Sequence, residues 1–180
     1  MAPKADVIAR ALDAEGGERL SFGEVDVLLK ASADTTGGAF TLFEERSPVD
    51  TPLHVHANED ELFYALEGEH VIQVGDEEFK VGPGGLVFAP RGVPHAQRRV
   101  VPRQGRMLIL TSPAGLEGFF RELAEADRVG ELGPEAYARA SENYGVTWLN
   151  DVESARPVRL MGREGSERAP VTERGSRWES

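Results

Sequence analysis

Short runs of alternating hydrophobic and polar residues fill the middle of the chain, from about residue 19 to residue 111. The runs include EVDVLLKAS, AFTLFEER, PLHVHA, ELFYALEG, HVIQVG, GLVFAP and GRMLILTS, and Gly, Pro, Asp and Asn separate them. Period-two runs at this spacing predict an antiparallel all-β sandwich or barrel. The segment VGDEEF places Gly-Asp between two such runs, which predicts a tight hairpin.

The hydrophobic period changes after residue 113. Leu116, Phe119, Phe120 and Leu123 recur at the spacing of one helix face, which predicts an amphipathic helix. The segment GPEAYARASENYG begins with a proline at a first helical position and ends at a glycine, which predicts a second short helix. The expected organisation is an N-terminal segment (1–18), a β domain (19–112), a helical extension (113–152) and a mobile tail (153–180).

The two ends of the chain carry weaker patterns. Residues 1–18 are polar and rich in alanine, which is compatible with one short helix. This segment has no unbroken apolar stretch, so we expect neither a signal peptide nor a membrane anchor. Residues 153–180 are rich in Arg, Glu, Gly, Ser and Pro and lack periodicity, which is why they are predicted to be mobile.

Charge and composition narrow the function. The 180-residue chain has a formal net charge of −11, which argues against nucleic acid or an anionic membrane as its main partner. It has no cysteine, so disulfides and thiolate chemistry are excluded, and any metal must be held by His, Asp or Glu. We expect a cytoplasmic protein.

Two of the four histidines lie one residue apart, in the segment HVHANEDELFYALEG. Residues i and i+2 of a strand point the same way, so His54 and His56 are predicted to project side by side and to share one ion. Glu59, Asp60 and Glu61 follow closely, and the spacing alone leaves open which of them adds a carboxylate.

A third histidine, His95, follows a turn built from Pro90, Gly92 and Pro94. Three histidines and one carboxylate are typical ligands of a first-row divalent metal with one or two open positions. His70, the remaining histidine, comes two residues after Gly68, where we expect a solvated turn residue rather than a ligand.

Two segments resemble the two motifs of the cupin superfamily. The first motif runs His-x-His, four residues, Glu, six residues, Gly, and the second runs Gly, five residues, Pro-x-Gly, two residues, His. Pro48 stands where the first motif usually begins with Gly, and Arg99 stands where the second usually ends with Asn, but neither position ligates metal. The matching residues are His54, His56, Glu61, Gly68, Gly84, Pro90, Gly92 and His95.

The resemblance implies an all-β fold, a jelly-roll β-barrel with the metal inside, followed here by two short C-terminal helices and a flexible tail. It implies that His54, His56, Glu61 and His95 bind one divalent transition metal ion, with Fe, Mn, Ni, Co, Cu and Zn all open. The whole chain is similar to single-domain cupins described as quercetin dioxygenase-like. Such a protein would use dioxygen to open the ring of a flavonol or related enol or aromatic molecule, with Glu61 also acting as base.

Two alternatives stay open: a non-oxidative metal-dependent isomerase or polyketide cyclase, and a cupin that binds a small molecule without catalysis. Phe63 shares the inward face of its strand with Glu61, and Gln97 and Arg99 share a face with His95, so these three are candidate substrate-binding residues. The expected partners are a small-molecule substrate and dioxygen. Because sheet edges must be covered, we also expect a homodimer, formed through an edge strand within residues 20–45 or through helices within 115–145.

Overall fold

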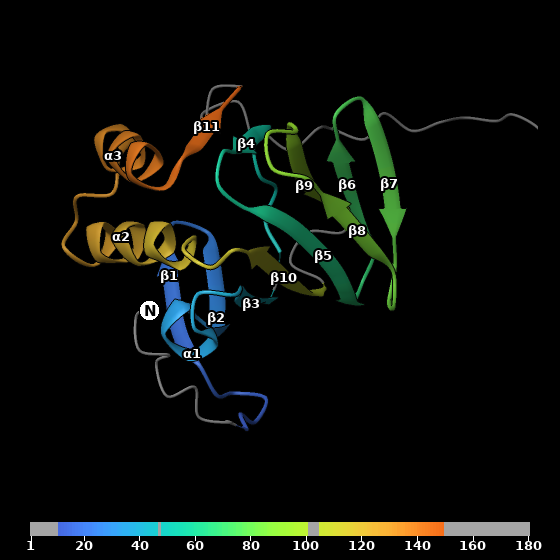
Figure 1. The fold of residues 1–180 in the computed structure, drawn as a ribbon, viewed down its shortest axis with the longest axis horizontal. Coiled ribbons are helices and arrows are strands. Elements are labelled where there is room, and N and C mark those ends of the chain that lie inside the picture. The colour runs from blue at the N-terminus through green and yellow to red at the C-terminus, as the bar shows by residue number, and fades with distance from the viewer. Residues whose placement is uncertain (1–10, 47, 101–104, 150–180) are drawn as a thin grey trace, which may run out of the picture.

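Two antiparallel sheets make up the β domain in the computed structural model, which describes residues 11–46, 48–100 and 105–149 (Figure 1). The first sheet has the order β1 (Glu18–Phe22), β2 (Val25–Ala31), β3 (Thr41–Arg46), β10 (Arg106–Ser112), β5 (Asp60–Glu67) and β8 (Leu86–Ala89). The second has the order β11 (Val146–Trp148), β4 (His54–His56), β9 (His95–Arg99), β6 (His70–Val74) and β7 (Glu77–Val81).

The predicted fold class is confirmed: the described residues form a mostly β, jelly-roll-like domain followed by two helices. The sheets do not close into a barrel, since β1 and β8 are edges of the first sheet and β11 and β7 are edges of the second. The predicted hairpin is also confirmed, because β6 and β7 pair in antiparallel register around Gly75 and Asp76. Gly75 has a φ of 58°, a conformation that favours glycine.

The N-terminal segment differs from its prediction where it can be compared. Residues 11–17 form turns and no helix, and the backbone N–H of Gly16 donates to the carbonyl of Asp13. Two consecutive glycines, Gly16 and Gly17, oppose helix continuation at this point. The rest of the 1–18 segment and the predicted tail at 153–180 lie outside the described residues.

The helical extension covers one side of the first sheet (Figure 1). Helix α2 (Glu117–Arg128) packs on β1 and on α3 (Pro134–Tyr144), and it buries Phe119 and Leu123. After α3 the chain adds strand β11, which pairs with β4 and was not predicted. A short helix, α1 (Ala33–Thr36), was also not predicted. None of the helices in the described segments is long and apolar enough to span a membrane.

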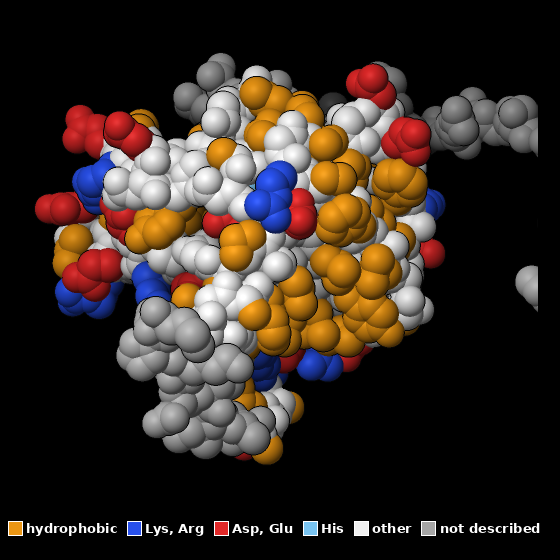
Figure 2. Space-filling view, in the orientation of Figure 1, with side chains coloured by type: hydrophobic (Ala, Val, Ile, Leu, Met, Phe, Trp, Pro, Cys, Tyr) orange, Lys and Arg blue, Asp and Glu red, His pale blue; other side chains and the backbone are white. Residues whose placement is uncertain are grey.

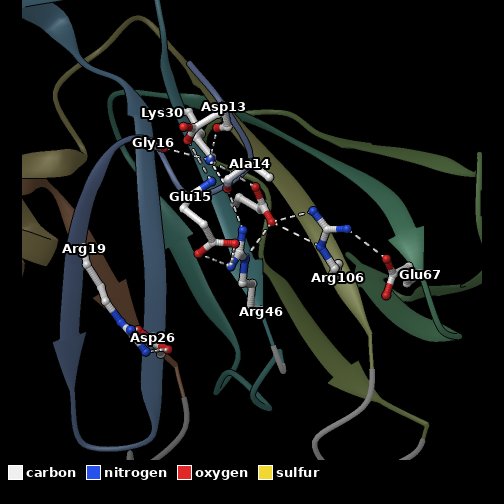
Figure 3. Close-up of polar contacts among 11 residues, drawn as sticks. Asp13, Ala14, Glu15, Gly16, Arg19, Asp26, Lys30, Arg46, Glu67 and Arg106 are labelled. Carbon is white, nitrogen blue, oxygen red and sulfur yellow. Dashed lines mark hydrogen bonds and ion pairs between the residues drawn. The ribbon is translucent and has the colours of Figure 1, made fainter.

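The two faces of β3 differ in chemistry. Its side chains alternate, so Thr41, Phe43 and Glu45 share one face and Glu44 and Arg46 lie on the other. The outer face carries a network of charged side chains, in which basic residues extend from β2, β3 and β10 (Figure 3). The inner face belongs to the core, where Phe43 is 1% exposed.

The outer face of the first sheet becomes apolar toward β8. Leu86 and Phe88 are each 52% exposed and pair with Tyr64 and Leu62 of β5, and Figure 2 shows hydrophobic side chains gathered over this region. This patch lies outside both segments that were expected to form a dimer contact. The homodimer itself stays a prediction.

Candidate metal centre

Three strands bring the four predicted ligands together. His54 and His56 lie on one face of β4, which is buried at both histidines, and Glu61 lies near the start of β5. His95 begins β9 and pairs directly with His54 across the sheet. One ligand atom from each of the four buried side chains lies within 4.8 Å of the others.

Backbone carbonyls fix two of the imidazoles so that Nε2 faces the centre. Nδ1 of His54 donates to the carbonyl of Pro52 at 2.8 Å, and Nδ1 of His95 donates to the carbonyl of Val93 at 2.9 Å. A histidine that donates through Nδ1 keeps its Nε2 lone pair available for a metal. The short turn before each histidine therefore sets the tautomer as well as the position.

The separations between donor atoms fit a shared cation. His54 Nε2 lies 3.1 Å from His56 Nε2, His56 Nε2 lies 3.4 Å from Glu61 Oε2, and His95 Nε2 lies 2.7 Å from the same oxygen. Atoms that ligate one ion at about 2.0–2.2 Å lie roughly 3 Å apart when the bond angles are near 90°. Two facing imidazole nitrogens also repel each other unless a proton or a cation lies between them, so the residues present fit a divalent metal.

Burial and mutual charge keep most of the ligands ready for a metal. Burial lowers the pKa of His54 to about 3, and it also lowers the pKa of His56, so both rings are neutral at pH 7. Burial opposes the ionisation of Glu61, but the three histidines outweigh it and lower its pKa to about 2. Burial likewise opposes the charging of His95, and Glu61 outweighs it, so the pKa of His95 is raised. Metal binding would therefore release a proton here.

A second carboxyl lies beside the centre without ligating it. Glu59 is 4% exposed, and its Oε2 lies 3.9 Å from Nδ1 of His56. Neither atom has a hydrogen-bond partner among the described residues. Burial, with a smaller contribution from Glu61, raises the pKa of Glu59 to about 7. Glu61 rather than Glu59 or Asp60 is thus the carboxylate in the cluster, since Asp60 pairs outward with Arg91.

The cluster borders an internal cavity of about 100 Å³. Its walls are mainly apolar, and its polar lining comes from two places: the metal centre, and a pair formed by Glu45 and Gln97. Gln97 Nε2 donates to Glu45 Oε2 at 2.6 Å. Burial raises the pKa of Glu45 to about 7, while its hydrogen bond from Gln97 acts in the opposite direction.

The candidate substrate-binding residues have different positions. Phe63 is 3% exposed, lines the cavity, and has its ring centroid 6.2 Å from that of His95. Gln97 also lines the cavity. Arg99 is not among the lining residues, and its guanidinium lies 3.6 Å from Asp50 and 3.5 Å from Glu24. A role for these residues in substrate binding stays a prediction.

His70 differs from its prediction in burial. It is 1% exposed rather than solvated, and its Nε2 donates to the carbonyl of Glu67 at 2.9 Å. The turn after Gly68 folds back over the ring, and Gly105 packs so closely that an added Cβ would meet it at 2.8 Å. His70 does not belong to the donor cluster.

Two cavity residues escaped the sequence analysis. Glu45 was visible as a carboxylate on the apolar face of TLFEER, since it shares the period of Thr41 and Phe43. Trp148 lies on β11 opposite His54, with ring centroids 5.1 Å apart, and it lines the cavity. No local pattern predicts that contact, because it depends on how the C-terminal strand returns to β4.

Comparisons with known proteins identify part of the chain. Residues 45–110 match the family model of the cupin domain. KdgF from Halomonas sp. is 18% identical with a TM-score of 0.51, over 60% of this chain and 96% of that chain. TT1209 from Thermus thermophilus is 29% identical with a TM-score of 0.43, over 52% of this chain and 89% of that chain.

A conserved protein with a double-stranded β-helix domain from Klebsiella pneumoniae is 15% identical with a TM-score of 0.49, over 60% of this chain and 93% of that chain. No curated protein matches this sequence. The likeness to the Halomonas structure concerns the fold, and none of these matches selects a reaction.

Proposed function

Because residues 45–110 form a cupin domain around three histidines and a glutamate, we propose that this protein is a metal-dependent oxygenase. Its reaction would resemble that of quercetin 2,3-dioxygenase, with dioxygen opening the ring of an enol-type or aromatic small molecule. The observation that supports this best is the buried donor cluster at the wall of an apolar cavity. A mainly apolar cavity with a few convergent polar groups is typical of small-molecule sites.

The chain's own residues have distinct roles in this proposal. His54, His56, Glu61 and His95 would hold the divalent ion, which supplies a Lewis acid that favours the enolate form of the substrate. The apolar walls exclude water from the reacting group. Glu61 Oε2 lies 2.7 Å from His95 Nε2, so it accepts the substrate's hydroxyl proton only if it exchanges this contact for one to the substrate.

The size of the cavity favours a small substrate within this class. An engineered apolar cavity of about 150 Å³ binds benzene, and the cavity here measures about 100 Å³. A flavonol has three rings, so it would require the covering side chains of α2 and β11, Phe119 and Trp148, to move. A single-ring enol or phenol fits the space with less rearrangement.

Glu45 favours a second candidate function, a non-oxidative isomerase or cyclase. A general acid–base group works best with a pKa near the operating pH, and the pKa of Glu45 is raised to about 7 by burial. This carboxyl lines the same cavity as the metal centre and could return a proton to an enolate without any oxygen step.

Metal analysis and oxygen uptake together test the proposal. Protein purified from its own host should contain about one divalent transition metal ion per chain, and it should consume oxygen with a panel of single-ring enols, phenols and flavonols. Turnover that is equal with and without air would support the non-oxidative candidate instead. Ligand binding without turnover under either condition would indicate a binding protein.

A further inference from the structure

Gln97 has a buried polar atom that the protein leaves without a partner. The residue is 3% exposed and lines the cavity. Its Nε2 donates to Glu45 Oε2 at 2.6 Å and to the carbonyl of Val49 at 3.1 Å. Its Oε1 has no hydrogen-bond partner among the described residues. An unpaired buried acceptor in a folded protein calls for an explanation such as a bound water or ligand.

The orientation of this amide follows from its neighbours. The carbonyl of Val49 accepts hydrogen bonds and cannot donate, so the NH₂ group of Gln97 must face it. Glu45 reinforces the same orientation, since its carboxylate accepts the second N–H. Rotating the amide would place Oε1 against two acceptors. The free group at this end of the cavity is therefore a hydrogen-bond acceptor.

The acceptor lies next to the metal centre. His95 and Gln97 are two residues apart on β9 and share its inner face, which separates their backbones by about 6–7 Å. That distance and the cavity volume of about 100 Å³ both correspond to one ring. A ring with one oxygen at the donor cluster can thus present a second substituent to Gln97.

We propose that Gln97 determines substrate specificity by accepting a hydrogen bond from a second hydroxyl group on a single-ring substrate, and that Glu45 positions its amide. This inference rests on the proposed function, because it assumes that the first oxygen faces the metal centre. It narrows the substrate class to single-ring enols or phenols that carry a further hydroxyl group. A molecule of the same shape with a methyl group at that point would leave Oε1 unpaired and would bind less well.

A matched pair of ligands tests this directly. Zinc-loaded protein, kept free of oxygen, is titrated with 1,3-dihydroxybenzene and with 3-methylphenol, and binding is followed by ligand-observed NMR. We expect the dihydroxy compound to bind about 10-fold more tightly, the effect of one well-made hydrogen bond. Gln97→Met keeps the side-chain length but removes the acceptor, so it should abolish the preference.

Two further variants guard against a folding defect. Gln97→Asn retracts the amide by one carbon and should reduce the preference even if Gln97→Met does not fold. Glu45→Gln can still accept from Gln97 Nε2, so it should keep the preference and serves as the matched control. Circular dichroism of each variant reports whether the β domain has folded.

Equal affinity of the wild-type protein for the two compounds would show that a water satisfies Gln97, and it would overturn the inference. A preference that survives in both Gln97 variants, or a failure of the wild-type protein to bind either compound, would overturn it as well. Repeating the titration without zinc separates this result from the proposed function. A protein that binds no metal refutes the proposed function, whereas the hydroxyl preference reports on Gln97 in either case.

Discussion

Glu44 and Glu45 are neighbours on β3, and each is 4% exposed, yet their surroundings are opposite. Glu44 lies on the outer face, where Arg106 approaches to 2.7 Å, Arg46 to 2.8 Å and Lys30 to 3.4 Å (Figure 3). Burial opposes ionisation there, but the hydrogen bonds from the two arginines outweigh it and lower the pKa of Glu44 to about 2.

Glu45 faces the cavity, where no lysine or arginine of the described segments forms an ion pair with it. It accepts from Gln97 and, at 3.3 Å, from the backbone N–H of Val49. Burial dominates, the charge of Glu61 adds to it, and the pKa of Glu45 rises to about 7. Equal burial thus gives opposite charge states, because the partners differ.

The difference shows how one strand can serve both stability and chemistry. A buried carboxyl without a cationic partner costs stability when it ionises. The outer face of β3 avoids that cost with three cations, and the inner face does not. Buried titratable groups with shifted pKa values concentrate at functional sites, and Glu45 lies beside one.

Glu61 extends the comparison to a third buried carboxyl, and its replacement should have the largest effect. Glu61→Gln keeps the shape and one ligating oxygen but removes the charge and most of the basicity. If Glu61 is both ligand and base, turnover per bound metal should fall by roughly 10²–10⁴, the range for a lost general base. Steady-state rates of the variant, divided by its measured metal content, check this prediction.

The role of Glu61 as a base is wrong if the remetallated variant keeps most of its turnover per metal. In that case Glu61 is only a ligand, and Glu45 becomes the remaining carboxyl of the cavity that can move a proton. Glu45→Gln is therefore the matched control, since it removes a buried carboxylate from the same cavity without touching the donor cluster.

Replacing Glu44 should cost stability by an amount that depends on pH. Glu44→Gln weakens charged hydrogen bonds to Arg46 and Arg106 and leaves Lys30 without its carboxylate, which should lower the free energy of unfolding by about 2 kcal/mol at pH 7. The folded-state pKa of about 2 lies below the usual 4.5, so this stabilisation is complete above pH 4.5 and is lost as the pH falls toward 2. Urea unfolding of both proteins at pH 7, 5 and 3.5 measures the narrowing difference.

Replacing Glu45 should have a smaller effect of opposite sign. The folded protein holds the Glu45 proton more tightly than the unfolded chain, so stability is lost as the pH rises from 4.5 to about 7, and the loss is complete above pH 7. Glu45→Gln removes this loss, although its new NH₂ group lacks a good acceptor, and a gain of about 1 kcal/mol remains at pH 8. At pH 4 the two proteins should unfold at the same urea concentration. A variant that is less stable at pH 8 would contradict the cavity-side assignment.

The sequence was sufficient for the β domain and the donor cluster because both depend on local patterns. Alternation predicted the strands, and the i, i+2 rule placed His54 beside His56. The turn before His95 was visible in its prolines and glycine. Each of these features is encoded within about ten residues, so no long-range contact is needed to predict it.

The cavity was harder to predict because its walls come from distant parts of the chain. Glu45, Gln97 and Trp148 meet only when β3, β9 and β11 are in place, and β11 pairs with β4 across roughly ninety residues of sequence. Alternation suggested an inward Glu45 but could not say whether a cation would meet it. The charge state of a buried carboxyl depends on those long-range partners, so pattern alone does not give it.

Glu67 sharpens the comparison with the smallest expected effect, because it shares an arginine with Glu44. Arg106 contacts Glu67 at 2.8 Å and Glu44 at 2.7 Å, but the side chain of Glu67 is 60% exposed and that of Glu44 is 5% exposed. Exposed ion pairs contribute little, since water and salt screen them and both side chains lose freedom. Glu67→Gln should therefore shift the melting temperature by less than about 2 °C, and 0.5 M salt should remove the shift. A decrease as large as that of Glu44→Gln would mean that the network on β3 acts as one cooperative unit, and that burial is not what separates its members.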